Sequence, residues 1–444
     1  MNIAMIGTGH VGLVSGACFS ELGNKVICVD NDEEKIRMLK KGGIPIYEPG
    51  LEKLVKENIK KERLFFSTSI EEGVDKSEII FITVGTPPRE NGEADLFSVE
   101  RVCRKIAKNM RGYKLIVEKS TVPVQTGQWI KRTFRMFSEN KDFNLASNPE
   151  FLREGSAVHD FLNPQRIVIG VENEKASNLL KELYLPIIKG EFNSSLKDKG
   201  SSPVSLIITN IQSAEVIKHA SNCFLATKIS FINALADICE RVGADIEKVA
   251  EGMGQDKRIG KSFLEAGIGF GGFCFPKDLQ AFIRLSEKFN YDFTLLKEVD
   301  KINKQRPSLL VKKIEEALWI LKDKTIGILG LSFKPDTDDL RFAPSIEVIR
   351  LLQREGAKVR AYDPKAIESA KKILKNVDYG KDPYEVARGS DALVILTEWD
   401  EFRKMELERI KKLLINPVII DGRNIFGPEK MREMGFIYKS IGRP

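Results

Sequence analysis

A glycine motif near the start of the chain constrains the fold more than any other feature of the sequence. Gly7-Thr-Gly9-His-Val-Gly12 directly follows the apolar run at residues 3–6 and precedes a stretch with helical spacing. In such a strand–turn–helix unit, glycine allows a tight turn, close approach of the backbone to a pyrophosphate, and packing of the helix on the strand. The motif therefore predicts that the chain opens with a dinucleotide-binding βαβ unit.

Short apolar runs alternate with helical stretches at both ends of the chain, as in doubly wound sheets. The strands that we expect in the first part are residues 3–6, 25–29, 79–84, 115–118, 144–147 and 167–171. After Asp323 the alternation begins again, and we expect strands within 324–334, 358–364, 391–399 and 417–424. Residues 204–318 show no strand alternation, and 214–242 carry apolar side chains at helical spacing. We predict an α/β fold with two Rossmann-like doubly wound domains joined by a central helical domain.

A chain of 444 residues is too long for one compact core. The domains that we expect are residues 1–195, 204–318 and 319–444. The polar segment 190–203 (GEFNSSLKDKGSSP) has the composition of a linker or surface loop. A long central helix would bridge the flanking domains and offer a face for a homodimer.

The composition of the chain indicates its cellular compartment and the kinds of partner that it binds. The N-terminus lacks the basic region of a signal peptide, and no apolar run approaches the roughly 20 residues of a membrane span. Six scattered cysteines form no CxxC pair, which suits a reducing cytoplasm. The 70 basic residues are interspersed with 63 acidic ones, so an anionic small substrate explains the net charge as well as nucleic acid does. We expect a cytoplasmic protein with no membrane attachment, no nucleic-acid partner and no metal site.

The cofactor is predicted from the residues that follow the glycine motif. Asp30 ends the second expected strand, 18 residues after Gly12. A carboxylate there bonds a ribose 2′-hydroxyl and repels a 2′-phosphate, so NAD is favoured over NADP. Lys35 is either part of this site or a solvated helix lysine, and His10 is expected to line the glycine loop beside Val11.

Polar clusters follow three of the expected strands. They are 84–88 with Thr86, 119–123 with Thr121, and 148–155 with Glu150, Phe151, Leu152 and Glu154. Each cluster alone could be ordinary turn chemistry. In a doubly wound sheet, however, ligands bind beyond the carboxyl ends of the strands. Three such clusters beside a dinucleotide motif predict a binding site at that edge.

A second glycine-rich segment, GIGFGGFCFPKD at residues 267–278, is the most distinctive part of the chain. Its glycines give a backbone that can wrap a ligand. Cys274, close to Lys277, has the setting of a thiolate nucleophile. Cys223 and Cys239 lie in apolar helical stretches instead, and we assign them to core packing.

Seven motifs in order resemble those of the nucleotide-sugar 6-dehydrogenase family over essentially the whole chain. They are GTGHVG, KSTVPVQT, NPEFLREG, KHASNCFLA, GFGGFCFPKD, FKPDTDDLR and DGRN. The resemblance implies a four-electron oxidation of a sugar C6 alcohol by NAD, through a thiohemiacetal and a thioester on Cys274. It further implies a dinucleotide-binding role for residues 1–195, a dimerisation role for 204–318 with the cysteine loop, and UDP-sugar binding by 319–444.

The same resemblance implies roles for individual residues. Thr121 and Asp278 would hold a water that takes the alcohol proton, Lys218 and Asn222 would stabilise an oxyanion, and Glu150 would activate water. Without the resemblance, Lys218 and Asn222 could equally be a solvated helix face. The implied cofactor contacts are Gly7, Gly9, His10, Val11, Gly12, Asp30, Lys35, Thr86, Thr121, Glu154, Cys274, Lys277 and Arg341. The implied substrate contacts are Glu150, Phe151, Leu152, Glu154, Lys218, Asn222, Arg258, Phe263, Gly267, Phe270, Gly271, Phe333, Lys334 and Arg423, of which Arg258 would serve a neighbouring subunit.

Two positions depart from the family pattern and leave the substrate more open than the reaction. Phe273 stands where many members have serine, and Arg153 replaces a small residue. CFPKD resembles the branch that oxidises UDP-glucose; the alternatives are UDP-N-acetylmannosamine, UDP-N-acetylglucosamine and GDP-mannose. A non-catalytic NAD-binding sensor or scaffold would not need Cys274, and neither would a two-electron 3-hydroxyacid dehydrogenase.

Overall fold

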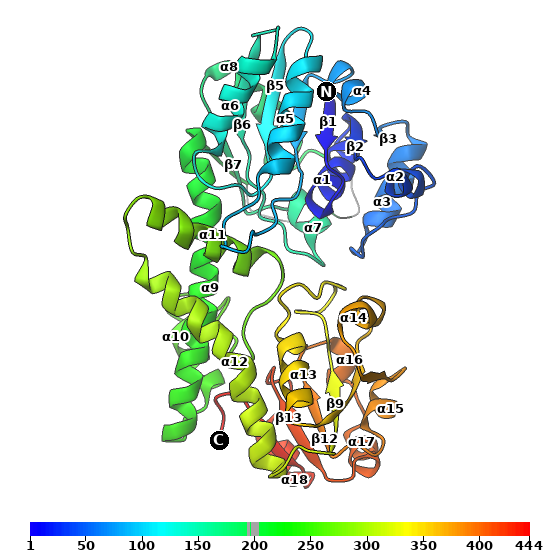
Figure 1. Cartoon of the computed structure of the whole chain (residues 1–444), viewed down its shortest axis with the longest axis vertical. Coiled ribbons are helices and arrows are strands. Elements are labelled where there is room, and N and C mark those ends of the chain that lie inside the picture. Colours follow the sequence, from blue (N-terminus) through cyan, green and yellow to red (C-terminus); the bar gives the residue numbers. More distant parts are fainter. Residues whose placement is uncertain (193–195, 197–203) are drawn as a thin grey trace. The chain divides into compact units, whose positions relative to one another are not determined.

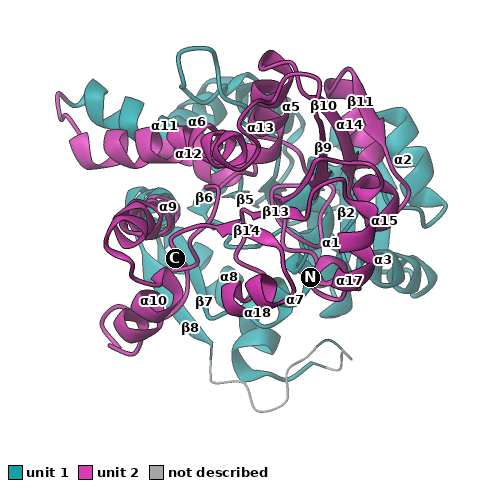
Figure 2. Cartoon of the chain, turned by 90° about the horizontal axis from the view of Figure 1, so that it is seen from below, with its two compact units in different colours: residues 1–221, 280–289 teal, residues 222–279, 290–444 magenta. Residues whose placement is uncertain are grey.

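The chain divides into two compact units (Figure 2). The computed structural model describes residues 1–192, 196 and 204–444, so most of the predicted linker at 190–203 lies outside the described residues. The first unit comprises residues 1–221 and 280–289, and the second comprises 222–279 and 290–444. Helix α9 (Ile211–Val242) passes from the first unit into the second, and α11 (Cys274–Lys288) passes back.

The first unit is built on an eight-stranded sheet with the order β3-β2-β1-β4-β5-β6-β7-β8. Strands β1 to β6 run parallel to one another; β7 is antiparallel to β6, and β8 is parallel to β7. The strands are β1 (Asn2–Ile6), β2 (Lys25–Val29), β3 (Leu64–Ser67), β4 (Ile79–Ile82), β5 (Lys114–Glu118), β6 (Phe143–Ser147), β7 (Arg166–Val171) and β8 (Ser205–Thr209). All six strands predicted for this part of the chain are confirmed.

Helices cover both faces of this sheet (Figure 1), which is the doubly wound arrangement. One face packs against α1 (His10–Glu21), α2 (Glu33–Lys40), α3 (Leu51–Lys60), α7 (Ala157–Leu162) and α8 (Glu174–Lys189). The other face packs against α4 (Ile70–Asp75), α5 (Phe97–Asn109) and α6 (Thr126–Phe137). The strands are buried on both sides by these two cores, as their continuous apolar runs predict.

The N-terminus of α6 is held by a side chain from a remote part of the chain. Glu215 on α9 accepts hydrogen bonds from the backbone N–H groups of Gln125 (2.7 Å) and Gly127 (2.8 Å), which lie 90 and 88 residues away. The first N–H groups of a helix have no partner within the helix, so this carboxylate stabilises the start of α6.

Strand β8 corrects the prediction that residues 204–318 contain only helices. Residues 205–209 pair with β7, so the first sheet extends past the expected boundary at 195. The segment SLIIT is short, half exposed, and followed directly by a helix, so it carries no alternation that could mark it. Strand β3 was missed for a similar reason, because it has only four residues.

The second unit contains a six-stranded, all-parallel sheet with the order β11-β10-β9-β12-β13-β14. Its strands are β9 (Thr325–Leu329), β10 (Lys358–Tyr362), β11 (Val377–Tyr379), β12 (Ala392–Ile395), β13 (Val418–Asp421) and β14 (Ile437–Ser440). Around it lie α13 (Pro344–Arg354), α14 (Ile367–Ile373), α15 (Pro383–Ala387), α16 (Asp400–Arg403), α17 (Leu407–Leu413) and α18 (Pro428–Glu433). The four predicted strands are confirmed, and β11 and β14 extend the sheet at its two edges.

The central helices are α9, α10 (Ile246–Gly254), α11 and α12 (Thr294–Leu318). The predicted helix at 214–242 is confirmed as part of α9. In the second unit, residues of α9, α10 and α12 share one apolar core with β9, β12 and β13. The fold is therefore α/β with a Rossmann-like sheet at each end and a central helical region. Within the described ranges, no helix is long and apolar enough to cross a membrane.

Candidate active site

The loops after β1, β2, β4, β5 and β6 leave the same edge of the first sheet, because these strands run parallel. This edge carries the glycine loop, Asp30 and the three polar clusters predicted from the sequence. Two of the clusters are in direct contact: the Thr86 hydroxyl donates to the carbonyl oxygen of Thr121 over 2.7 Å. The predicted convergence of polar loops is present in the first unit.

The glycine loop has the shape that a pyrophosphate requires. Gly7 has φ +107°, and a Cβ there would lie 2.6 Å from the carbonyl oxygen of Thr83. A Cβ on Gly12 would collide with the carbonyl oxygen of Gly7. Around Gly9, by contrast, no atom lies within 4 Å of a Cβ position. Close packing therefore excludes any side chain at Gly7 and Gly12. At Gly9 the space is open, and it lies beside the N-terminus of α1, where phosphate groups bind.

Asp30 lies at the end of β2, where a ribose hydroxyl is bound in dinucleotide sites. Its Oδ2 accepts hydrogen bonds from Thr8 N (2.9 Å) and Thr8 Oγ1 (2.7 Å), and Lys35 Nζ lies at 3.2 Å. Burial acts to raise the pKa of Asp30, but the hydrogen bonds from Thr8 and Asp32 and the charge of Lys35 lower it below its ordinary value. Lys35 is therefore bonded to Asp30 rather than only solvated, and the loop and this carboxylate fit NAD.

His10, the first residue of α1, contacts a carboxylate that the sequence did not mark. Its Nε2 lies 3.0 Å from Oε2 of Glu48, whose side chain is fully buried. Glu48 also accepts hydrogen bonds from the backbone N–H groups of Gly155 and Ala157, both over 2.8 Å. Glu48 thus connects the glycine loop to the loop that carries Glu154.

Glu150 and Lys218 form a buried ion pair in the first unit. Lys218 Nζ lies 3.0 Å from Glu150 Oε1, and the two side chains are only 5% and 4% exposed. The other carboxylate oxygen accepts the N–H of Leu152 over 2.6 Å. The ring of Phe151 lies 5.4 Å from Lys218 Nζ. The alternative in which Lys218 sits on a solvated helix face is wrong.

Lys119 lies in the same region and is also buried. Its Nζ donates to Asn148 Oδ1 over 3.1 Å. Burial lowers the pKa of Lys119 to about 8; the charge of Glu150 opposes this fall, and that of Lys218 adds to it. This part of the first unit therefore holds a buried amine with a lowered pKa beside the Glu150–Lys218 pair.

Arg166 reaches the same edge of the sheet because β7 runs in the opposite direction to β6. The pairing of Ser147 with Gly170 places the start of β7 beyond the carboxyl end of β6. The Arg166 guanidinium lies 3.9 Å from the centre of the Phe151 ring, which fixes that ring by a cation–π contact.

In the second unit, Asp278 is held at both carboxylate oxygens. Asn222 Nδ2 donates to Oδ2 over 2.6 Å, and Lys277 Nζ donates to Oδ1 over 2.6 Å. All three side chains are buried, so for Asn222 the solvated-face alternative is also wrong. Cys274 begins α11 one helical turn before Asp278. It is half-buried, whereas the other five cysteines are buried.

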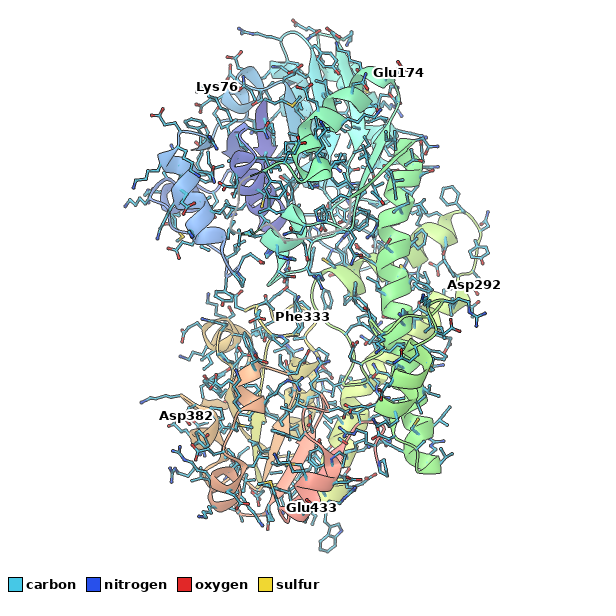
Figure 3. All side chains as sticks on the ribbon, turned by 180° about the vertical axis from the view of Figure 1, so that it is seen from behind. Lys76, Glu174, Asp292, Phe333, Asp382 and Glu433 are labelled. Carbon is cyan, nitrogen blue, oxygen red and sulfur yellow. The ribbon has the colours of Figure 1, made fainter. Side chains whose placement is uncertain are left out.

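The glycines before Cys274 are packed too tightly for side chains. A Cβ on Gly271 would lie 2.5 Å from the carbonyl oxygen of Phe342, and one on Gly272 would lie 2.7 Å from the Phe333 ring. Gly272 N donates to the carbonyl oxygen of Arg341 over 2.9 Å. Phe333, which is labelled in Figure 3, comes four residues after the end of β9. The cysteine loop therefore lies directly against a loop of the second sheet.

Other predicted substrate residues gather around the cysteine loop as well. Arg423 Nη1 donates to the carbonyl oxygen of Gly269 over 3.4 Å, and Nη2 donates to that of Phe333 over 3.3 Å. The rings of Phe263 and Phe270 lie 6.2 and 5.9 Å from that of Phe275. Gly267 N donates to Asn233 Oδ1 over 2.7 Å.

The remaining predicted residues have simpler surroundings. Arg258 is 89% exposed and pairs with Asp256 over 2.6 Å. The Lys334 amine lies 5.9 Å from the Phe333 ring. Of the two departures from the family pattern, Arg153 pairs with Asp160 over 2.6 Å, and the Phe273 ring lies 4.4 Å from the Arg341 guanidinium. Within the described ranges, no three His, Cys, Asp or Glu side chains are grouped so as to hold a metal ion.

Sequence reasoning assigned no role to Glu48, Lys119 or Arg166. Glu48 acts through contacts more than a hundred residues away, which no local pattern encodes. Lys119 is part of a motif, but its importance depends on burial. Arg166 is the first residue of β7, one position before the strand predicted at 167–171, and the sequence prediction used only polar residues that follow strands.

Family models match most of the chain. Three models of the UDP-glucose/GDP-mannose dehydrogenase family match in order: the NAD binding domain at residues 1–188, the central domain at 212–305 and the UDP binding domain at 327–428.

Curated relatives and a solved structure match over full length. The UDP-glucose 6-dehydrogenase TuaD of Bacillus subtilis is 50% identical over 444 residues, covering 100% of this chain and 93% of that protein. The UDP-glucose 6-dehydrogenase of Rhizobium meliloti is 45% identical over 448 residues and is covered completely. The UDP-glucose dehydrogenase of Pyrobaculum islandicum is 37% identical with a TM-score of 0.91, covering 100% of this chain and 98% of that one. These matches agree with the glycine loop, Asp30 and the cysteine loop: the chain belongs to the UDP-glucose/GDP-mannose dehydrogenase family.

Proposed function

We propose that this chain is an NAD-dependent UDP-glucose 6-dehydrogenase that oxidises the C6 alcohol of the sugar to a carboxylate in two steps. The observation that carries the proposal is the half-buried Cys274 in a tightly packed glycine loop, one turn from a carboxylate held by Asn222 and Lys277. A two-electron alcohol dehydrogenase needs no nucleophile, whereas oxidation of an aldehyde to an acid through a thioester does.

The first oxidation converts the alcohol into an aldehyde. NAD, when bound, accepts a hydride from C6 in each of the two oxidations. Asp278 is our candidate for holding the water that takes the hydroxyl proton. The hydrogen bonds that fix both of its oxygens keep the carboxylate in one orientation.

The second stage uses Cys274 as the nucleophile. Its thiolate sulfur adds to the aldehyde carbon, so a C–S bond forms and the carbonyl oxygen takes a proton to give a thiohemiacetal. Loss of a second hydride from C6, and of the proton from that oxygen, gives a thioester. We assign stabilisation of the negative oxygen to Lys218 and Asn222, a cation and an amide donor.

Hydrolysis completes the reaction. Water adds to the thioester carbon, the C–S bond breaks, and the carboxylate and the thiol are released. Glu150 is our candidate base for this water. Its contacts with Lys218 and Leu152 N leave its carboxylate oriented but buried, which is how a general base is held ready.

The choice of UDP-glucose rests on the names of the relatives and on residues of the second unit. The relatives at 45–50% identity are named UDP-glucose 6-dehydrogenases, and residues 327–428 match a UDP binding domain. Phe333, Lys334 and Arg423 follow strands of the second sheet, and basic side chains in such loops suit a diphosphate. We accordingly assign NAD binding to 1–195, dimerisation and the cysteine loop to 204–318, and UDP-sugar binding to 319–444.

We further propose a cytoplasmic homodimer. Three large apolar side chains on α9, Phe224, Phe231 and Ile238, are spaced by seven residues and are more than half exposed, as in a helix face that packs on a second helix. Arg258 is exposed as well and would serve the partner's site. Sedimentation should give a dimer, and Phe231→Glu should shift it to monomers with lower activity. A fully active wild-type monomer would contradict this part of the proposal.

One assay tests the function directly. Purified protein, NAD and a panel of nucleotide sugars should give two NADH per UDP-glucose consumed, with little activity on UDP-N-acetylmannosamine, UDP-N-acetylglucosamine or GDP-mannose. A ratio of one NADH per sugar would rule out the thioester route, and a preference for another sugar would correct the substrate.

A further inference from the structure

Glu48 contacts the glycine loop although it lies in a different loop of the first unit. It lies in the loop between α2 and α3, and its buried carboxylate receives three contacts. Oε2 accepts from Gly155 N and lies 3.0 Å from His10 Nε2, and Oε1 accepts from Ala157 N.

Three carboxylates act on the charge of His10. They are Glu48 from the 41–50 loop, and Glu154 and Glu150 from the 148–155 loop. Burial acts to lower the pKa of His10, but the Glu48 carboxylate 3.0 Å away and the charges of Glu154 and Glu150 outweigh it, so the pKa is raised above its ordinary value. His10 therefore keeps its proton to a higher pH than an ordinary histidine.

A cation on His10 lies at the N-terminal end of α1, the end of a helix at which phosphate groups bind. His10 is the first residue of α1 and follows Gly9, where the space is open. A positive charge on a helix N-terminus is unfavourable by itself, so Glu48 offsets that cost in the free protein. When the pyrophosphate of NAD binds there, the imidazolium adds a charge-assisted donor to the backbone N–H groups.

We propose that Glu48 is a positioning residue, which holds His10 as a charged donor for the pyrophosphate of NAD and ties this loop to the loop bearing Glu150 and Glu154. The inference rests on the NAD dependence in the proposed function, but it does not depend on which sugar is oxidised. It makes the affinity for NAD depend on pH. The positive charge is present below the pKa of His10 and is lost as pH rises through it, so affinity falls with rising pH.

The test is direct titration of the full-length protein with NAD by calorimetry between pH 6 and 9. The Kd of the wild type should rise roughly tenfold across this range, because a tenfold change corresponds to the free energy of one charge-assisted hydrogen bond. His10→Asn should bind weakly at every pH, and His10→Lys should bind tightly at every pH. Glu48→Gln should move the transition to lower pH, because the imidazolium loses its main partner.

Glu52→Gln is the matched control, since Glu52 is an exposed residue of α3 that pairs with Lys56. Its pH profile should coincide with that of the wild type. A wild-type Kd that does not change between pH 6 and 9, or a Glu48→Gln profile identical to the wild type, would overturn the proposal. If Glu48→Gln fails to fold, the two His10 variants decide the matter, because they leave the buried carboxylate in place.

The readout separates this proposal from the proposed function. Binding of NAD is measured without any sugar, so a protein inactive on UDP-glucose could still show the pH profile. Conversely, if the enzyme is active on UDP-glucose but its affinity for NAD is the same in the wild type and the His10 variants, the proposed function stands and the role of Glu48 is wrong.

Discussion

Asn222 and Asp278 are joined by a 2.6 Å hydrogen bond although 56 residues separate them in the chain. The amide comes from α9, and the carboxylate comes from α11, one helical turn after Cys274. With Lys277 on the other oxygen, Asp278 has no freedom to rotate, and the start of the helix that bears Cys274 is anchored. Substitutions in the candidate active site therefore have specific expected effects on rate, binding or stability.

Cys274→Ser should lower the rate of UDP-glucuronate formation by roughly 10³-fold or more, as other deletions of a covalent nucleophile do. A serine hydroxyl is much less acidic than a thiol and leaves poorly, so the acyl intermediate would not form or turn over. NAD binding should survive, because the glycine loop and Asp30 lie in the first unit. Steady-state rates and NAD titration measure the two effects separately.

Cys239→Ser is the matched control, because Cys239 is buried in the core of the second unit and plays no part in the proposed chemistry. Its kcat should stay close to that of the wild type in any variant that folds. If Cys274→Ser retained a rate within about tenfold of the wild type, a barrier change of only ~1.4 kcal/mol, Cys274 would not be the nucleophile.

Asp30→Asn should weaken NAD binding and relax the discrimination against NADP. The carboxylate is fixed by Thr8 and Lys35 at the end of β2, and it repels a 2′-phosphate. Loss of one charge-assisted hydrogen bond corresponds to roughly a tenfold rise in KM for NAD. The ratio of kcat/KM values for NAD and NADP is the measurement, and Glu34→Gln on the exposed face of α2 is the control. An unchanged ratio would remove Asp30 from the cofactor site.

Lys119 should make stability depend on pH above neutrality. Burial lowers its pKa from 10.5 to about 8, so between these values the unfolded chain binds more protons than the folded one. The free energy of unfolding must then rise with pH over this window, by up to about 3 kcal/mol. Below pH 8 both states are protonated, and the full cost of burying the charge is present.

Urea denaturation between pH 7.5 and 10 measures this dependence. Lys119→Met should lose the rise, whereas Lys105→Met, on the exposed face of α5, should keep it. Parallel pH profiles for the wild type and Lys119→Met would show that the buried amine does not titrate in this window.

The Glu150–Lys218 pair should behave as one unit. Lys218→Met leaves a buried carboxylate without its closest cation and should cost about 3–5 kcal/mol of stability. The double variant Glu150→Gln/Lys218→Met removes both charges and should recover part of this loss. A double-mutant cycle in urea gives the coupling energy, and additive effects of the two substitutions would contradict the buried pair.

The sequence predicted the fold where apolar runs were long and uninterrupted. The strands later found as β1, β2, β9 and β12 lie in such runs, bounded by clear turns. The edge strands β3, β8, β11 and β14 did not appear, because they are short and partly exposed. The antiparallel pairing of β7 with β6 was not predicted either, because an apolar run does not indicate in which direction a strand pairs.

The candidate site was predictable in its motifs but not in its electrostatics. Glycine turns and polar strand ends mark Gly7, Asp30 and Cys274 locally. The side chains that hold neighbouring groups, Glu48 for His10 and Asn222 for Asp278, lie 38 and 56 residues away from them in the chain. A spacing pattern cannot distinguish a solvated Lys218 from a buried one, because both occupy the same helical position.

The carboxylate of Glu215 imposes an order of events during synthesis. Residues 125–137, which include α6, leave the ribosome long before Glu215 does, so the N–H groups of Gln125 and Gly127 must at first be satisfied by water. Only when the beginning of α9 has been translated can the cap close. The polar loop at 119–123, directly before that cap, therefore gains its final support from a segment made about 90 residues later, and a ribosome that stalls before Glu215 would present this edge of the sheet incomplete.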